Sequence, residues 1–196
     1  LDRSSAASDV YKRQVDTDGS SFNANANGGQ SYISEDFDAN LEEAKQLLAD
    51  AGYPNGEGLP TITYTTNDAG YHKTVAEYLQ QAWGELGINV EVNIVEWSSF
   101  TPMRRNGEYM VARNGWVGDY SDPSNMLDLF CTGNGNNDGK FSNADFDAAM
   151  EKAASTMDTA ERSAALHQAE DVLMEQVGCI PVAYYNDFWL QSSKIT

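Results

Sequence analysis

The sequence is short of basic residues and of cysteine, and it has no long apolar run. Its 196 residues include 12 Lys and Arg against 30 Asp and Glu, which gives a formal net charge of -18. A surface this acidic repels phosphate backbones and anionic headgroups, so nucleic acid and membrane surfaces are poor partner candidates. No apolar stretch reaches the roughly 18 residues of a membrane-spanning helix, so we expect no direct membrane insertion from this segment.

Only two cysteines occur, Cys131 and Cys179. Two are too few for a disulfide-rich scaffold or a four-cysteine zinc site, and they allow either one disulfide or two unrelated buried thiols. The motifs G-x-S-x-G, H-E-x-x-H, the P-loop and G-x-G-x-x-G are also missing. The Asn/Gly-rich stretch at 134–145 imitates EF-hand spacing but lacks the charges that hold calcium. We therefore predict no catalytic residue, no metal site and no cofactor.

The chain does contain enough apolar material for a folded core, with 41% hydrophobic and 11% aromatic residues. Residues 1–14 (LDRSSAASDVYKRQ) have no apolar signal-peptide region and no core pattern, and we interpret them as a non-native or artefactual leader.

Hydrophobic periodicity predicts an α/β fold. A strand at 61–66, a helix at 73–86 and a strand at 88–95 form a βαβ unit, which requires parallel pairing. Before this unit we expect a helix at 41–51 that is capped by Asn40 and Glu43. The further elements that we expect are a helix at 98–105, a strand at 109–117, a helix opened by Pro123, a loop at 132–140, helices at 144–155 and 159–176, and a final strand at 180–190.

The segment RNGWVGDY, from Arg113 to Tyr120, directly follows a predicted strand. Ligands of open α/β sheets bind beyond the carboxyl ends of the strands. Asp119 is suited to an ammonium group and Arg113 to a carboxylate, while Trp116 offers an aromatic surface. This combination favours a zwitterionic ligand. The alternative is that Trp116 belongs to the core and that Arg113 and Asp119 pair with each other.

The chain resembles solute-binding protein family 5, the oligopeptide- and dipeptide-binding receptors of ABC importers. Five segments carry the resemblance in the family's order: LEEAKQLLADAGYPNGEGLP, HKTVAEYLQQAWGELGINVEV, GWVGDYSDPSNMLDLF, FSNADFDAAMEKA and AEDVLMEQVGCIPVAYYND. The resemblance covers residues 15–196. It implies that residues 61–196 form the C-terminal α/β ligand-binding lobe of a type II periplasmic-binding-protein-like fold, with a mixed sheet flanked by helices. Residues 15–60 would be the end of the preceding lobe with a connecting helix. It also implies a receptor with two lobes that close on an extended peptide, of which this chain supplies one.

The resemblance implies roles for individual residues. Asp119 would bind the α-ammonium group of the peptide, and Trp116, followed by Val117, would line a side-chain pocket. Arg113 and His72 would reach the C-terminal carboxylates of peptides of different length. The presence of both favours an oligopeptide receptor over a dipeptide or nickel receptor.

Three further residues match peptide-contacting positions of the family. Arg104 matches an arginine in the short helix, although the neighbouring Arg105 leaves two registers for this match. Tyr184 and Tyr185 match aromatic residues of the last strand that touch peptide backbone.

The function implied is that of the peptide-binding component of an ABC importer, with the membrane permease subunits as partners. We expect a monomer outside the cytoplasm, either in the periplasm or as a cell-surface lipoprotein of a Gram-positive bacterium. Two alternatives stay open. One is a receptor of the same family for a dipeptide, nickel or another small solute. The other is an α/β hydrolase that uses His72 and Asp119 as an acid/base pair.

Overall fold

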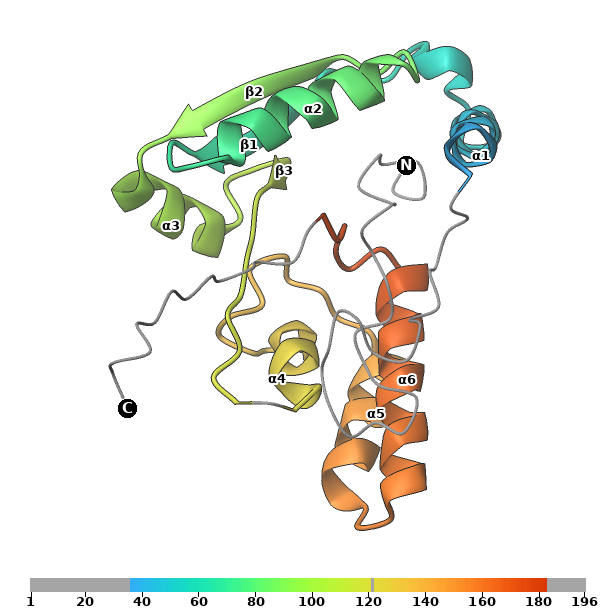
Figure 1. The fold of residues 1–196 in the computed structure, drawn as a ribbon, viewed down its shortest axis with the longest axis vertical. Helices are drawn as coiled ribbons and strands as arrows, with labels where there is room; N and C mark the ends of the chain where they lie inside the picture. Colours follow the sequence, from blue (N-terminus) through green and yellow to red (C-terminus); the bar gives the residue numbers. More distant parts are fainter. Residues whose placement is uncertain (1–35, 121, 183–196) are drawn as a thin grey trace, which may run out of the picture.

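The structure is a computed structural model that describes residues 36–120 and 122–182. The described elements are α1 (Phe37–Asp50), the 3-10 turn η4 (Pro54–Gly56), β1 (Ile62–Asn67), α2 (His72–Gly84), β2 (Val90–Val95), α3 (Trp97–Asn106), β3 (Val111–Ala112), α4 (Ser124–Leu127), the 3-10 turn η5 (Asp128–Phe130), α5 (Ala144–Ser155) and α6 (Thr159–Glu175). They form two groups (Figure 1). We call residues 37–112 the βαβ half, residues 124–175 the helical half, and residues 113–123 between them the bridging segment.

The βαβ half contains a three-stranded sheet with the order β2-β1-β3. Both pairings are parallel: Ile62 lies opposite Val90 in the first, and Tyr64 lies opposite Val111 in the second. The predicted βαβ unit is therefore confirmed, with α2 as the crossover helix. Every strand pairing among the described residues is parallel, whereas we expected a mixed sheet. The final strand expected at 180–190 falls mostly outside the described residues, and residues 180–182 are not in a strand.

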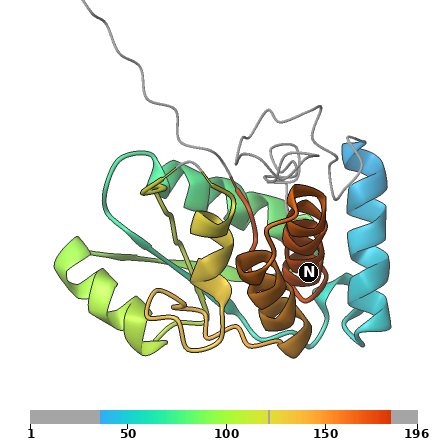
Figure 2. The same ribbon diagram turned by 90° about the horizontal axis from the view of Figure 1, so that it is seen from below.

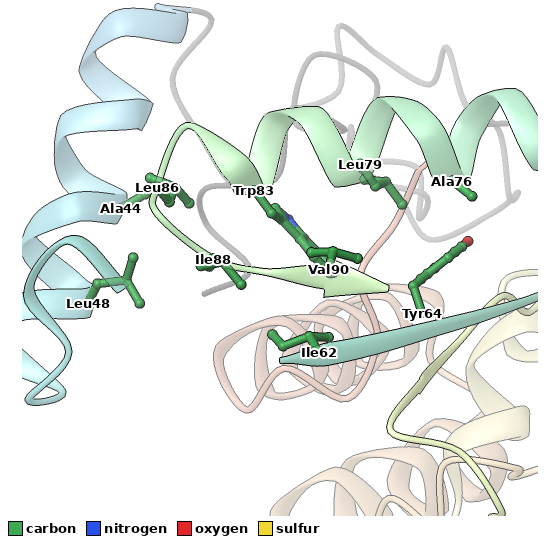
Figure 3. Close-up of a cluster of buried hydrophobic side chains, with 10 residues drawn as sticks. All are labelled: Ala44, Leu48, Ile62, Tyr64, Ala76, Leu79, Trp83, Leu86, Ile88 and Val90. Carbon is green, nitrogen blue, oxygen red and sulfur yellow. The ribbon is translucent and has the colours of Figure 1, made fainter. Parts of the chain in front are cut away.

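The core of the βαβ half is built by alternation along the strands and by one face of α2 (Figure 3). Ile62 and Tyr64 of β1 point toward α2, where Leu79 and Trp83 meet them. Helix α1 adds Leu48, which is 1% exposed. The sequence places apolar residues at every second position of the strands and at helical spacing in α2, so the two periodicities meet in one buried layer.

Two turns of this half touch backbone to backbone. Gly56, after α1, and Gly87, after α2, both have positive φ, at 74° and 78°. A Cβ atom on Gly87 would collide with the backbone oxygen of Asn55, and one on Gly56 would collide with the backbone of Gly87. The contact ties α1 to the βαβ unit and requires glycine on both sides.

The helical half packs α5 against α6 around a separate core. Phe146 and Leu166 are 0% exposed, and Phe141 meets Phe146 edge to face with ring centroids 5.4 Å apart. The sequence caps both helices, because Asn143 accepts the backbone N–H groups of Asp145 and Phe146 and Asp158 accepts that of Glu161. Both predicted helices are confirmed. Seen from below, the helical half crosses the middle of the molecule and α1 runs along one side (Figure 2).

Polar contacts join the two halves. The Nε atom of Arg104, on α3, lies 2.7 Å from the Oδ2 atom of Asp138. The Tyr109 hydroxyl donates to the backbone oxygen of Asp138 over 3.0 Å. The two buried hydrophobic clusters share no residue, so the halves have separate cores, and Ile180, which follows α6, packs against the cluster of the βαβ half.

Two sequence expectations need correction. The strand expected at 109–117 is reduced to Val111–Ala112, because the chain leaves the sheet at Arg113 to reach the helical half. Helix α1 begins four residues earlier than expected, because Asp36 caps it by accepting the backbone N–H of Ala39 over 3.1 Å, so Asn40 is a buried interior residue.

No disulfide joins the two cysteines, and each is partly buried against the core of the helical half. Burial raises the pKa of the Cys131 thiol to about 11, and the nearby carboxylates of Asp128 and Asp147 act in the same direction. Of the two alternatives left by the sequence, the structure has the separate thiols. Among the described residues, none of the helices has the length and apolar character to span a bilayer.

Candidate ligand-binding site

The carboxyl ends of the three parallel strands lie along one edge of the sheet. Arg113 comes directly after β3, and its backbone N–H donates to the backbone oxygen of Thr65 over 2.9 Å. His72 is the first residue of α2, which follows β1 after a short turn. The fold therefore brings to one edge two residues that are separated along the sequence, and this is the edge at which α/β sheets bind ligands.

Arg113 is close enough to His72 to affect its ionisation. Partial burial and the positive charge of Arg113 both lower the pKa of His72 from its usual 6.5. The Tyr71 ring lies beside the imidazole, with ring centroids 4.9 Å apart. At neutral pH the pair therefore combines a permanent cation with a mostly neutral imidazole, and a carboxylate placed between them would raise the pKa of His72.

Further along the bridging segment, one side chain holds both Trp116 and the backbone of Asp119. The Oδ1 atom of Asn125 accepts the Trp116 indole N–H over 2.9 Å and the backbone N–H of Asp119 over 3.3 Å. Asn125 is 7% exposed and belongs to α4. Trp116 is consequently only partly buried, tethered at its nitrogen rather than sealed in the core.

The carboxylate of Asp119 is exposed, and it makes no ion pair or hydrogen bond with any residue that the structure describes. The expected alternative, an internal pair between Arg113 and Asp119, is therefore wrong. Val117, two residues before Asp119, is 76% exposed. The segment presents an anion, an apolar side chain and the rim of an indole at the surface.

Arg104 has an internal partner instead. Its side chain is 12% exposed, it pairs with Asp138, and its guanidinium carbon lies 5.5 Å from the centre of the Phe100 ring. The structure thus places Arg104 at the junction of the two halves, and its contact with a peptide stays a prediction. Tyr184 and Tyr185 lie outside the described residues.

Sequence reasoning missed two asparagines. Asn125 was invisible because its role depends on a contact between residues in different elements. Asn67 ends β1 at the same edge as Arg113, is 2% exposed, and has an Oδ1 atom without a hydrogen bond among the described residues. A polar residue at the carboxyl end of a central strand was the signal that could have found Asn67.

The geometry offers little for catalysis or metal binding. Within residues 36–120 and 122–182, no three His, Cys, Asp or Glu side chains gather as a metal site would need. No described Ser or Cys side chain hydrogen-bonds to the His72 imidazole, and such a bond is what the hydrolase alternative requires of a nucleophile. The arrangement is suited to holding charged and apolar groups of a ligand.

Comparisons with known proteins show the family of the chain. The sequence model of "Bacterial extracellular solute-binding proteins, family 5 Middle" matches residues 1–138, starting within the stretch that we interpreted as a leader. The chain is 31% identical over 166 residues to the oligopeptide-binding protein OppA of Bacillus subtilis. It is 34% identical over 145 residues to the periplasmic oligopeptide-binding protein OppA of Escherichia coli.

A solved structure shows the same fold. The Haemophilus influenzae OppA complex with the peptide RPPGFSPFR superposes with a TM-score of 0.71 at 30% identity, over 80% of this chain and 31% of that one. The matches cover 81% of this chain but 30% of the Bacillus protein, and 74% of this chain but 26% of the Escherichia protein. The chain thus spans about a third of its relatives' length, and over that span it belongs to the bacterial extracellular solute-binding proteins of family 5.

Proposed function

We propose that this chain forms one lobe of an extracytoplasmic receptor that binds oligopeptides for an ABC importer. The observation that carries the proposal is the exposed carboxylate of Asp119, which pairs with no residue in 36–120 or 122–182, on the same segment as Arg113, which lies near His72. Asp119 is assigned to the peptide ammonium group, and Arg113 with His72 to the terminal carboxylate. Names of related proteins that bind oligopeptides support the ligand class.

The spacing along the bridging segment suits a short peptide. Arg113 and Asp119 are six positions apart in the sequence, so their Cα atoms lie at most about 20 Å apart. An extended peptide of up to about six residues covers the same length. Trp116 and Val117 lie between the charged positions and are assigned to a side-chain pocket, while Arg104, Tyr184 and Tyr185 are assigned to further peptide contacts.

The proposal also assigns the lobes, the oligomeric state, the location and the partner of the protein. Residues 61–196 form the ligand-binding lobe, and residues 15–60 lead into it from a preceding lobe. The receptor acts as a monomer in the periplasm or on the outer face of the cell membrane, and it delivers peptide to the permease subunits. A relative whose solved structure is titled as an oligopeptide ABC transporter protein supports this partner.

The test uses the complete gene product that contains this chain, titrated calorimetrically with tetra-alanine, N-acetyl-tetra-alanine and tetra-alanine amide. Asp119→Asn should weaken tetra-alanine binding about ten- to hundred-fold, because one charge-assisted contact contributes roughly 1.5–3 kcal/mol. The same variant should leave N-acetyl-tetra-alanine unchanged. Asp145→Asn, an exposed aspartate on α5, is the matched control. Wild-type affinity in Asp119→Asn would remove this residue from the site, and no binding of any of the three probes by the wild-type protein would overturn the function.

A further inference from the structure

One buried oxygen connects the two residues of the bridging segment that the proposed function uses most. The Oδ1 atom of Asn125 accepts hydrogen bonds from the Trp116 indole and from the backbone of Asp119. The segment passes close to this oxygen between them, since a Cβ atom at Gly118 would lie 3.4 Å from it. A single acceptor therefore fixes the spacing between an aromatic surface and a carboxylate.

Asn125 is itself held in place by the helical half. Its backbone N–H donates to the backbone oxygen of Asp122 over 3.1 Å. The Asp122 carboxylate accepts the backbone N–H and the hydroxyl of Ser124, and it also accepts a guanidinium N–H of Arg162, on α6, over 2.8 Å. The oxygen that holds Trp116 and Asp119 is thus connected, through Asp122, to Arg162 on α6 of the helical half.

We infer that Asn125 is a positioning residue of the peptide site, which holds Trp116 and Asp119 in their binding arrangement before a ligand arrives. The inference rests on the proposed function, since it needs Asp119 to meet the peptide ammonium group. Without the shared acceptor, the bridging segment would have to be ordered when the ligand binds, and that ordering would lower the affinity.

The oxygen of Asn125 that accepts both hydrogen bonds determines which substitutions should preserve its role. Both bonds end on the same carbonyl-type oxygen, so aspartate can replace asparagine, whereas an apolar side chain of similar size cannot. Asn125→Leu therefore removes the tether, and Asn125→Asp keeps it. Asn137→Leu is the matched control, because Asn137 is also a buried asparagine, 5% exposed, but its amide bonds only to the loop around Phe130, Cys131 and Phe141.

The experiment measures binding of tetra-alanine and N-acetyl-tetra-alanine by the complete gene product, at a temperature where circular dichroism shows each variant folded. Asn125→Leu should weaken tetra-alanine binding about ten-fold, the size of one well-placed hydrogen bond, and should shrink its preference over the N-acetylated peptide. Asn125→Asp should restore both values to within about three-fold of wild type. If the leucine variant does not fold, Asn125→Ala, which also lacks the acceptor oxygen, is measured in its place.

The outcomes separate this inference from the proposed function. Failure of the wild-type protein to bind either probe would overturn the function and, with it, the role of Asn125. Tight binding by the wild type together with equal effects of Asn125→Leu and Asn137→Leu would overturn the positioning role alone. So would an aspartate variant as weak as the leucine variant, because the oxygen would then not be what matters.

Discussion

The two halves of the molecule are built on different principles. The βαβ half joins strands and helices through a parallel sheet, whereas the helical half buries α5 against α6 around Phe146 and Leu166. Each half has its own core, and most of the candidate site lies between the halves: Arg113, Trp116 and Asp119 belong to the bridging segment, while His72 begins α2 of the βαβ half. The comparison teaches that the ligand-facing geometry depends on how two separate cores are held relative to each other.

The largest expected effect on stability comes from a large-to-small substitution in one core, with hydrogen exchange measured in both halves. Phe146→Ala should lower the free energy of unfolding by about 3–5 kcal/mol, since it empties a fully buried aromatic site. Hydrogen exchange should show the loss of protection concentrated in α5 and α6. Leu79→Ala, in the βαβ half, is the mirror variant and should affect β1, β2 and α2 instead. Equal loss of protection in both halves for either variant would show that they unfold as one unit.

The second effect comes from the junction. Asp138→Asn leaves the Arg104 guanidinium without its carboxylate at a site where the two side chains are 12% and 7% exposed. We expect a loss of about 3 kcal/mol in urea denaturation, because an unpaired buried charge is costly. The double variant Arg104→Met with Asp138→Leu should recover most of that loss. A single variant as stable as wild type would mean that the ion pair does not hold the halves together.

The third effect concerns Asp122. Burial raises the pKa of this carboxyl, but hydrogen bonds from Arg162 and Ser124 outweigh it and hold the pKa below the usual 3.8. Its stabilising contribution is therefore complete above about pH 4 and is lost as the pH falls through the lower, folded-state value. Arg162→Leu should cost about 1 kcal/mol at pH 7. The difference from wild type should shrink in denaturation experiments near pH 2, and a difference independent of pH would contradict this account.

The smallest effect is a pH dependence of binding. Burial and Arg113 lower the pKa of His72, so the imidazole is mostly neutral at pH 7 and gains charge as the pH falls below about 6.5. Between pH 7 and pH 5, the affinity for tetra-alanine should rise by about two- to five-fold relative to its amide, which lacks the carboxylate. His72→Gln should abolish the change. A constant ratio in the wild type would place His72 outside the carboxylate site.

Local signals in the sequence predicted most of the elements. The alternation in β2 and the apolar stripes of α2 and α6 each act within one element, so hydrophobic periodicity suffices to find them. The strand expected at 109–117 was the main error, since residues 113–117 leave the sheet to reach the helical half. A tertiary connection outweighed local propensity there.

The charged residues of the candidate site could be selected from the sequence, whereas the residues that hold them in place could not. Arg113, Trp116 and Asp119 could be selected because their chemistry lies together in the sequence. The partners that place them could not be found this way: Asp138 occupies Arg104 from across the junction, and Asn125 and Arg162 reach back from the helical half. Such contacts depend on the packing of distant segments, which no spacing rule encodes.

The backbone contact between Gly56 and Gly87 constrains how this lobe can change over evolutionary time. Two turns of unrelated sequence, one after α1 and the other after α2, press together with no room for a methyl group. A Cβ atom on either glycine would meet backbone atoms of the other turn, and no substitution in that turn can make its backbone smaller, so both positions must stay glycine. Substitutions that change ligand preference are therefore expected in other surface loops and not at this contact.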